Sequence, residues 1–62
     1  MKKYLLVHEY RGCDASINVI SAQNDAGAIE AAKELFSGSL DESVSVYDLP
    51  EEGFAGLIEL IQ

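Results

Sequence analysis

Residues 24–38 read NDAGAIEAAKELFSG, and this stretch predicts the element around which the rest of the chain is arranged. Asn24 is a good N-cap, and Asp25 in the first turn suits the positive end of a helix. An apolar stripe at helical spacing follows, made of Ala28, Ile29, Ala32, Leu35 and Phe36. Gly38 is placed to end the element. The stretch therefore predicts one helix over 25–36 with a single apolar side.

Three runs around this helix are typical of strands. Residues 3–11 (KYLLVHEYR) and 16–22 (SINVISA) are rich in aromatic and branched side chains, and the turn sequence Gly12-Cys13-Asp14 between them predicts a hairpin. Residues 43–49 (SVSVYDL) alternate between polar and apolar and predict a third strand. Because a helical crossover precedes it, the third strand should lie beside the first, giving the order 2-1-3.

Residues 50–62 fit two structures. A helix beginning near Pro50 would align one apolar stripe, made of Phe54, Leu57, Ile58 and Ile61. Against it, Gly53 and Gly56 would each cost about 1 kcal/mol relative to Ala in a helix interior. The alternative is a loop followed by a fourth strand over 56–61. We favour the helix and keep the strand as the alternative.

The fold class that follows is α+β, with residues 1–62 as one small domain. We expect a small antiparallel sheet in a ββαβ arrangement plus a C-terminal helix or fourth strand, with the central helix packed on one face. A chain of 62 residues buries only about 60% of its unfolded surface, so its core is thin. The 48% hydrophobic content nevertheless argues against disorder, which requires low hydrophobicity together with high charge.

Several function classes are disfavoured by what the chain lacks. Cys13 is the only cysteine and His8 the only histidine, too few for a zinc site and without an orienting third group for a Cys-His nucleophile. We expect no catalytic residue, no metal and no cofactor, hence no enzyme. A lone cysteine also favours the cytoplasm over a secreted, disulfide-stapled domain. No run approaches the roughly 20 apolar residues that span a bilayer, so we expect no membrane association.

Charge is the strongest functional signal. The net charge is -7, and residues 34–62 hold seven carboxylates without one Lys or Arg. Direct binding of nucleic acid is disfavoured, because it requires basic residues that neutralise phosphates. One interpretation is a solvated face that keeps a small protein soluble. The other is a carboxylate array that replaces phosphates in an Arg- and Lys-rich protein groove. Its partner-binding residues would be Asp41, Glu42, Asp48, Glu51 and Glu52.

The chain also has more apolar residues than one helix can cover. If the helix packs on one face of the sheet, we expect the other face to carry Tyr4, Leu6, Tyr10, Ile20 and Tyr47. Monomers rarely leave so large a patch exposed, so the C-terminal segment covers it or it forms an interface. The candidate interface residues are Tyr4, Leu6, Tyr10 and Tyr47. A self-associating module, such as an antitoxin-like homodimer, is the alternative function that this surplus supports.

Residues 20–33 (ISAQNDAGAIEAAK) resemble the strand-to-helix joint of many small phage- and plasmid-borne ββαβ proteins. Together with the small size, the acidity and the lone cysteine, the chain is similar to anti-CRISPR proteins. Many of these bind a CRISPR effector stoichiometrically, and several imitate nucleic acid. The resemblance implies a phage-type inhibitor in the host cytosol that occupies a basic, nucleic-acid-binding surface of a defence complex. No motif defines the class, so it assigns a role to no residue.

Overall fold

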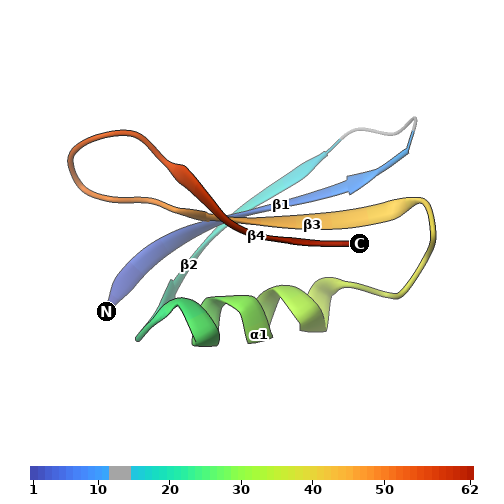
Figure 1. The fold of residues 1–62 in the computed structure, drawn as a ribbon, viewed down its shortest axis with the longest axis horizontal. Helices are drawn as coiled ribbons and strands as arrows, with labels where there is room; N and C mark the ends of the chain where they lie inside the picture. The colour runs from blue at the N-terminus through green and yellow to red at the C-terminus, as the bar shows by residue number, and fades with distance from the viewer. Residues whose placement is uncertain (12–14) are drawn as a thin grey trace.

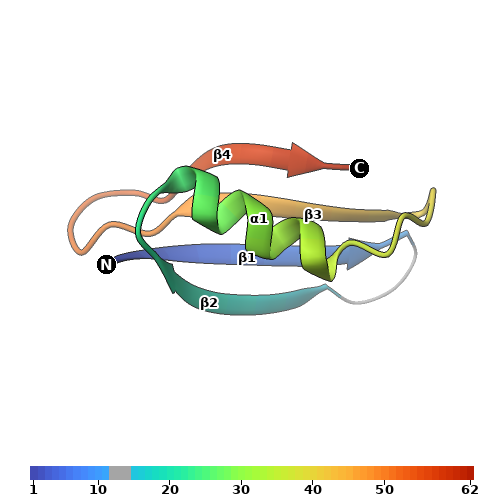
Figure 2. The same ribbon diagram turned by 90° about the horizontal axis from the view of Figure 1, so that it is seen from below.

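A computed structural model describes residues 1–11 and 15–62 of the chain. Its elements are β1 (Lys2–Tyr10), β2 (Ser16–Ala22), α1 (Asp25–Leu35), β3 (Glu42–Asp48) and β4 (Gly56–Ile61). The four strands form one antiparallel sheet in the order β2-β1-β3-β4, with α1 lying across one face (Figures 1 and 2). The α+β class and the 2-1-3 order of the first three strands are confirmed. The expected turn at Gly12-Cys13-Asp14 lies outside the described residues.

The helix begins and ends close to the predicted bounds. The side chain of Asn24 accepts a hydrogen bond from the Gly27 amide at 2.9 Å, which caps the first turn. Phe36 leaves the helix in an extended conformation, and its amide donates back to the carbonyls of Ala32 and Lys33. Within the described residues, no helix is long and apolar enough to cross a membrane.

The C-terminal helix that the periodicity favoured is wrong, and the alternative strand is what forms. Gly53 has a φ of +103°, which is incompatible with a right-handed helix at that position. Residues 56–61 pair instead with β3, with an irregularity in register between Val46 and Tyr47. That irregularity keeps both Ile58 and Ile61 against the core, although they are three residues apart. The strand also satisfies backbone groups of β3 that would otherwise form an open edge.

The core lies between α1 and the sheet. Its composition shows that our prediction of which side of the sheet the helix covers was wrong. Tyr4 and Leu6, which we expected on the uncovered face, have 0% and 1% of their surface exposed and pack beneath the helix. Two small helical residues, Ala28 and Ala32, face them and are themselves fully buried. Small side chains allow α1 to approach the sheet closely enough for the Tyr4 ring to fill the space between the layers. The uncovered face therefore belongs to the other set of alternating strand residues.

Candidate interaction surface

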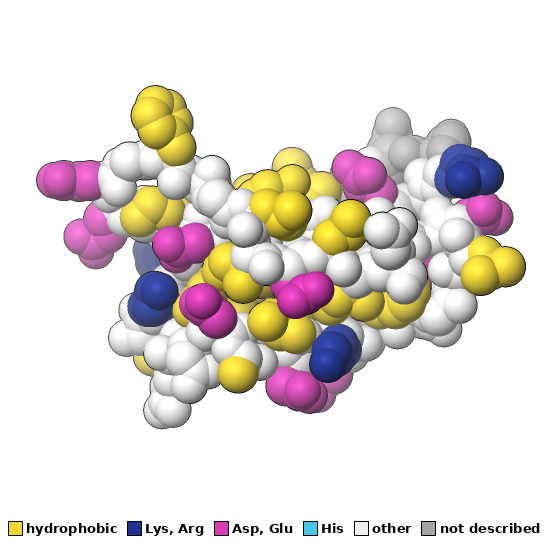
Figure 3. Space-filling model, in the orientation of Figure 1, with side chains coloured by type: hydrophobic (Ala, Val, Ile, Leu, Met, Phe, Trp, Pro, Cys, Tyr) yellow, Lys and Arg dark blue, Asp and Glu magenta, His cyan; other side chains and the backbone are white. Residues whose placement is uncertain are grey.

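The five acidic candidates do not form one array. Asp41 precedes β3 and forms an ion pair of 4.0 Å with Arg11, whereas Asp48 is the last residue of the same strand. Seven residues of strand separate these positions by about 20 Å. Glu51 and Glu52 are exposed in the loop that follows Asp48, at its end of the sheet. Figure 3 likewise shows acidic side chains spread over the visible surface, where they are separated by apolar and uncharged groups.

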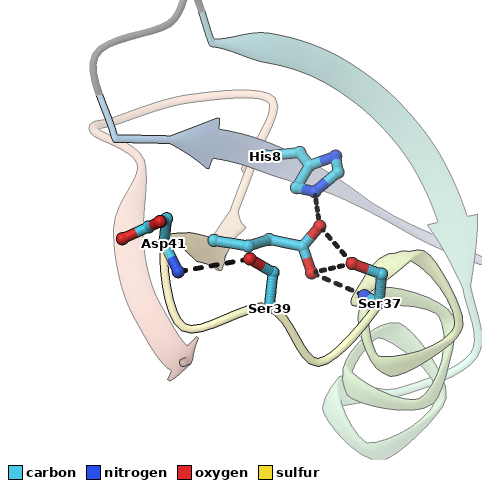
Figure 4. Close-up of polar contacts among 5 residues, drawn as sticks. His8, Ser37, Ser39 and Asp41 are labelled. Atoms are coloured by element: carbon cyan, nitrogen blue, oxygen red, sulfur yellow. Dashed lines mark hydrogen bonds and ion pairs between the residues drawn. The ribbon is translucent and has the colours of Figure 1, made fainter.

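Glu42 cannot contact a partner, because its side chain has no exposed surface. The His8 Nε2 atom on β1 lies 2.8 Å from Glu42 Oε2, and since a carboxylate only accepts, this nitrogen carries the proton. Ser37, just after α1, donates its amide to Oε1 at 2.5 Å and brings its hydroxyl within 2.9 Å of both oxygens. Figure 4 shows His8 and Ser37 reaching the same carboxylate from different elements. Assigning Glu42 to a partner-binding surface was therefore wrong.

The electrostatics of Glu42 fit a structural role. Burial by itself would raise the pKa of its carboxyl, but hydrogen bonds from His8, Tyr10 and Ser37 outweigh that effect and lower the pKa to about 2. The residue is thus ionised across the physiological range, with its charge distributed over several donors. Glu42 therefore fastens the α1–β3 connection to β1. His8, the only histidine, is used in this cluster, and its ring also lies 4.9 Å from that of Tyr10.

A second polar contact fixes the opposite end of the helix. The Tyr4 hydroxyl donates to Asp25 Oδ1 at 2.8 Å, and Lys2 Nζ lies 3.8 Å from the same oxygen. Burial, with the neighbouring carboxylates of Asp25 and Asp48, raises the pKa of Tyr4 to about 12. The tyrosine is therefore neutral and donating at any physiological pH. This contact anchors the start of α1 to β1, which explains why a tyrosine lies in the core rather than at an interface.

Two surface hollows lie among the described residues. The larger, of about 490 Å³, is an open groove walled by Tyr10, Arg11 and Asp41, together with one edge of the already satisfied Glu42. The smaller, of about 300 Å³, lies between the N-terminus and the segment after β3. In residues 1–11 and 15–62, no group of three or more His, Cys, Asp or Glu side chains is placed to hold a metal ion. The expected absence of a catalytic site stays a prediction.

The most distinctive surface is the face of the sheet opposite α1. Strand register places two rows of side chains across it. The first row runs Val19, Leu5, Tyr47, Leu57, and the second runs Ile17, Val7, Ser45, Leu60. We call these eight residues the open face. Seven of them are apolar or aromatic, and they are contiguous because each is a register neighbour of the next.

Exposure on the open face is large for residues of this type. Ile17, Val19 and Leu57 have 65%, 59% and 58% of their surface in water, and Leu60 has 41%. Single exposed apolar residues are ordinary, but a continuous row across four strands marks a contact surface in soluble proteins. Of the candidate interface residues, Tyr47 lies on this face, and Tyr10 is exposed but belongs to the side of the Glu42 cluster.

The alternation in β2 is the sequence signal for this face. Ile17 and Val19 alternate with Ser16 and Asn18, which shows that β2 has one apolar side. Ala22, a small residue three positions before the helix, shares its side with Ile20 rather than with Val19. Two residues join Ala22 to α1, and the helix covers the side of the sheet that Ala22 shares with Tyr4.

Comparison with known proteins gives no family to which the chain can be assigned, so the fold and the open face are what describe it. No protein-family model, curated protein or solved structure matches the chain. What the described residues define is a class: a small α+β protein whose four-stranded sheet is covered by one helix and apolar on its other side.

Proposed function

We propose that this protein is a non-enzymatic binding protein that acts by docking another protein surface on the open face of its sheet. The observation that carries the proposal is the pair of adjacent rows on that face, in which seven of the eight residues are apolar or aromatic. Leaving such a surface in water gains nothing for a chain whose core is already thin. Its burial would contribute apolar contact of the kind that drives protein association.

The difference between the two sides of the sheet supports the same proposal. Buried polar side chains are concentrated on the helix side, where Glu42 and Tyr4 are fully hydrogen-bonded and inaccessible. The open face has no comparable buried network, and its central residues Leu5, Val7 and Tyr47 are only half-buried. The fold thus separates a stabilising side from a side available for contact.

The test is capture with a matched pair of variants on one strand. Val19→Asp places a charge in the open face, whereas Asn18→Asp adds the same charge at the adjacent position, which is also exposed but lies on the helix side. Tagged wild-type and Asn18→Asp protein should retain a bound protein, including a second copy of the chain, that Val19→Asp loses. Equal retention by all three proteins would remove the open face as the docking surface.

A second candidate function is inhibition of the anti-CRISPR kind, in which acidic side chains occupy a basic nucleic-acid groove in the host cytosol. The observation in its favour is that Glu51 and Glu52 are exposed on the loop after β3, in a chain with a net charge of -7. The contact would now rest on this loop with Asp48, since Glu42 is buried and Asp41 lies at the far end of β3.

A further inference from the structure

We infer that the occupant of the open face is a second copy of the same chain, packed sheet against sheet about a twofold axis that runs across the strands. This inference rests on the proposed function, because it names the partner of the surface proposed there. Aligned sheet packing with interdigitating side chains is the ordinary way in which two apolar sheet faces bury each other. A twofold axis makes the contact self-complementary, so each residue is used twice.

The charges on the open side of the sheet are arranged for this symmetry. Strand alternation puts Lys3 and Glu9 on the same side as Leu5 and Val7, at opposite ends of β1. They are the charged residues that the described strands place on this side, and within the described residues neither forms an ion pair. Rotation about an axis across the strands reverses the strand direction. It therefore brings Lys3 of one copy to Glu9 of the other, twice in each dimer.

The two apolar rows match one another under the same rotation. The axis passes between the row of Leu5 and the row of Val7, so each row packs on the other row of the second copy. Tyr47, the largest side chain of the first row, then lies over Ser45, the smallest of the second. The remaining opposed pairs are Leu5 with Val7, Val19 with Ile17, and Leu57 with Leu60. Large over small and apolar over apolar is the pattern that fills such a contact without voids.

Part of the negative charge of each copy lies far from this contact. Exposed carboxylates such as Glu30 and Glu34 are on α1, which lies beyond the sheet from the open face. With each layer about 10 Å from the next, the helices of the two copies are roughly 30 Å apart. The Debye length at physiological salt is about 8 Å, so their repulsion is largely screened. A uniformly basic partner would leave Lys3 unpaired, whereas a second copy pairs it with Glu9.

The first experiment is the solution mass of the whole chain, measured by light scattering and sedimentation over a wide concentration range. We expect a dimer that persists at high salt, because most of its contact is apolar. Val19→Asp should raise the dimer Kd by roughly a hundredfold or more, since it buries an unpaired charge in each copy. Asn18→Asp should leave the Kd within about threefold of wild type, because an exposed charge contributes little.

A charge exchange tests the orientation of the two copies. Lys3→Glu and Glu9→Lys should each raise the Kd by about tenfold, because each replaces two attractive pairs with two repulsive ones. The double variant, and equally a mixture of the two single variants, should restore the wild-type Kd. Single variants that dimerise as tightly as wild type would overturn the antiparallel arrangement.

The outcomes separate the inference from the function on which it rests. Suppose that the chain stays monomeric and that Val19→Asp, but not Asn18→Asp, loses a captured protein. That result overturns the inference of a homodimer and leaves the open face as the docking surface for another protein. A monomeric chain whose capture is indifferent to Val19→Asp overturns both. A dimer that resists Val19→Asp but is broken by changes elsewhere also overturns the inference.

Discussion

The imidazole of His8 and the carboxylate of Glu42 meet 2.8 Å apart between β1 and β3, where Glu42 is completely buried. From the sequence alone, His8 had no assigned role and Glu42 was placed among the partner-binding acids. Their contact makes them part of the scaffold. A buried carboxylate with several donors is costly to disturb, because removing one partner leaves the others unsatisfied.

Replacing the Glu42 carboxylate should therefore destabilise the protein. In Glu42→Gln the amide nitrogen brings a second donor against the donors of Ser37 and His8, so at least one hydrogen bond is lost. We expect a clearly lower urea midpoint by circular dichroism. The matched control is Glu34→Gln, an exposed change on α1 with the same loss of charge. Equal midpoints for the two variants would contradict the structural role of Glu42.

The stability of the wild type should depend on pH through the same group. The pKa of Glu42 is lowered from 4.5 to about 2 in the folded chain, so the unfolded state binds the proton more readily. The contribution of the ionised group is complete above pH 4.5 and is lost as the pH falls from 4.5 through 2. The difference in unfolding free energy between wild type and Glu42→Gln should shrink across that range. If the difference in unfolding free energy between the two proteins does not change with pH, the charge of the Glu42 carboxylate does not stabilise the fold.

Core substitutions distinguish the covered side of the sheet from the open one. Leu6→Ala should cost about 2–5 kcal/mol, a large share of the roughly 3–9 kcal/mol expected for 62 residues. Leu40→Ala, at a fully exposed position in the α1–β3 connection, should stay within about 0.5 kcal/mol of wild type. The measurement is urea unfolding of both variants. A Leu6→Ala variant as stable as the Leu40→Ala control would place Leu6 outside the core.

Two glycines near β4 should respond in opposite directions. Gly53→Thr forces a branched side chain into a φ of +103° and should cost about 1–2 kcal/mol. Gly56→Thr places the same side chain in a strand, with no atom within 4 Å of the new Cβ, and should stabilise by up to about 1 kcal/mol. Thermal unfolding of the pair provides the comparison. Destabilisation by both variants would argue against a strand over 56–61.

The acidic loop has its own test, independent of the open face. If Glu51 and Glu52 contact a basic partner, Glu51→Gln with Glu52→Gln should weaken capture of that partner and flatten its salt dependence, with folding intact. Glu30→Gln with Glu34→Gln makes the same change of net charge on α1 and should have no such effect. The readout is the salt concentration at which the partner elutes from immobilised protein. Indistinguishable elution would leave the loop acids as solubilising groups.

Local pattern in the sequence determined much of this protein. The N-cap at Asn24 and the alternation predicted over 43–49 are effects of nearest neighbours, and both appear in the fold. Of the predicted helical stripe, Ala28 and Ala32 are buried, whereas Leu35 is 41% exposed. The helical crossover from β2 to β3 has a preferred right-handed sense. This rule placed β3 beside β1, with which it pairs antiparallel. The helix cap and the strand alternation depend on residues within a few positions of one another, whereas the strand order follows from the hand of the crossover.

Tertiary structure alone decided the rest. Whether residues 56–61 become helix or strand depends on the open edge of β3, which offers hydrogen bonds that no local pattern reveals. Glu42 looked like the exposed acids near it until packing brought His8 and Ser37 to its carboxylate from distant positions. The side of the sheet that α1 covers was settled by where small residues permit close approach. That choice determines which apolar residues form the core and which remain on the open face, because alternation supplies two sides but does not say which one faces water.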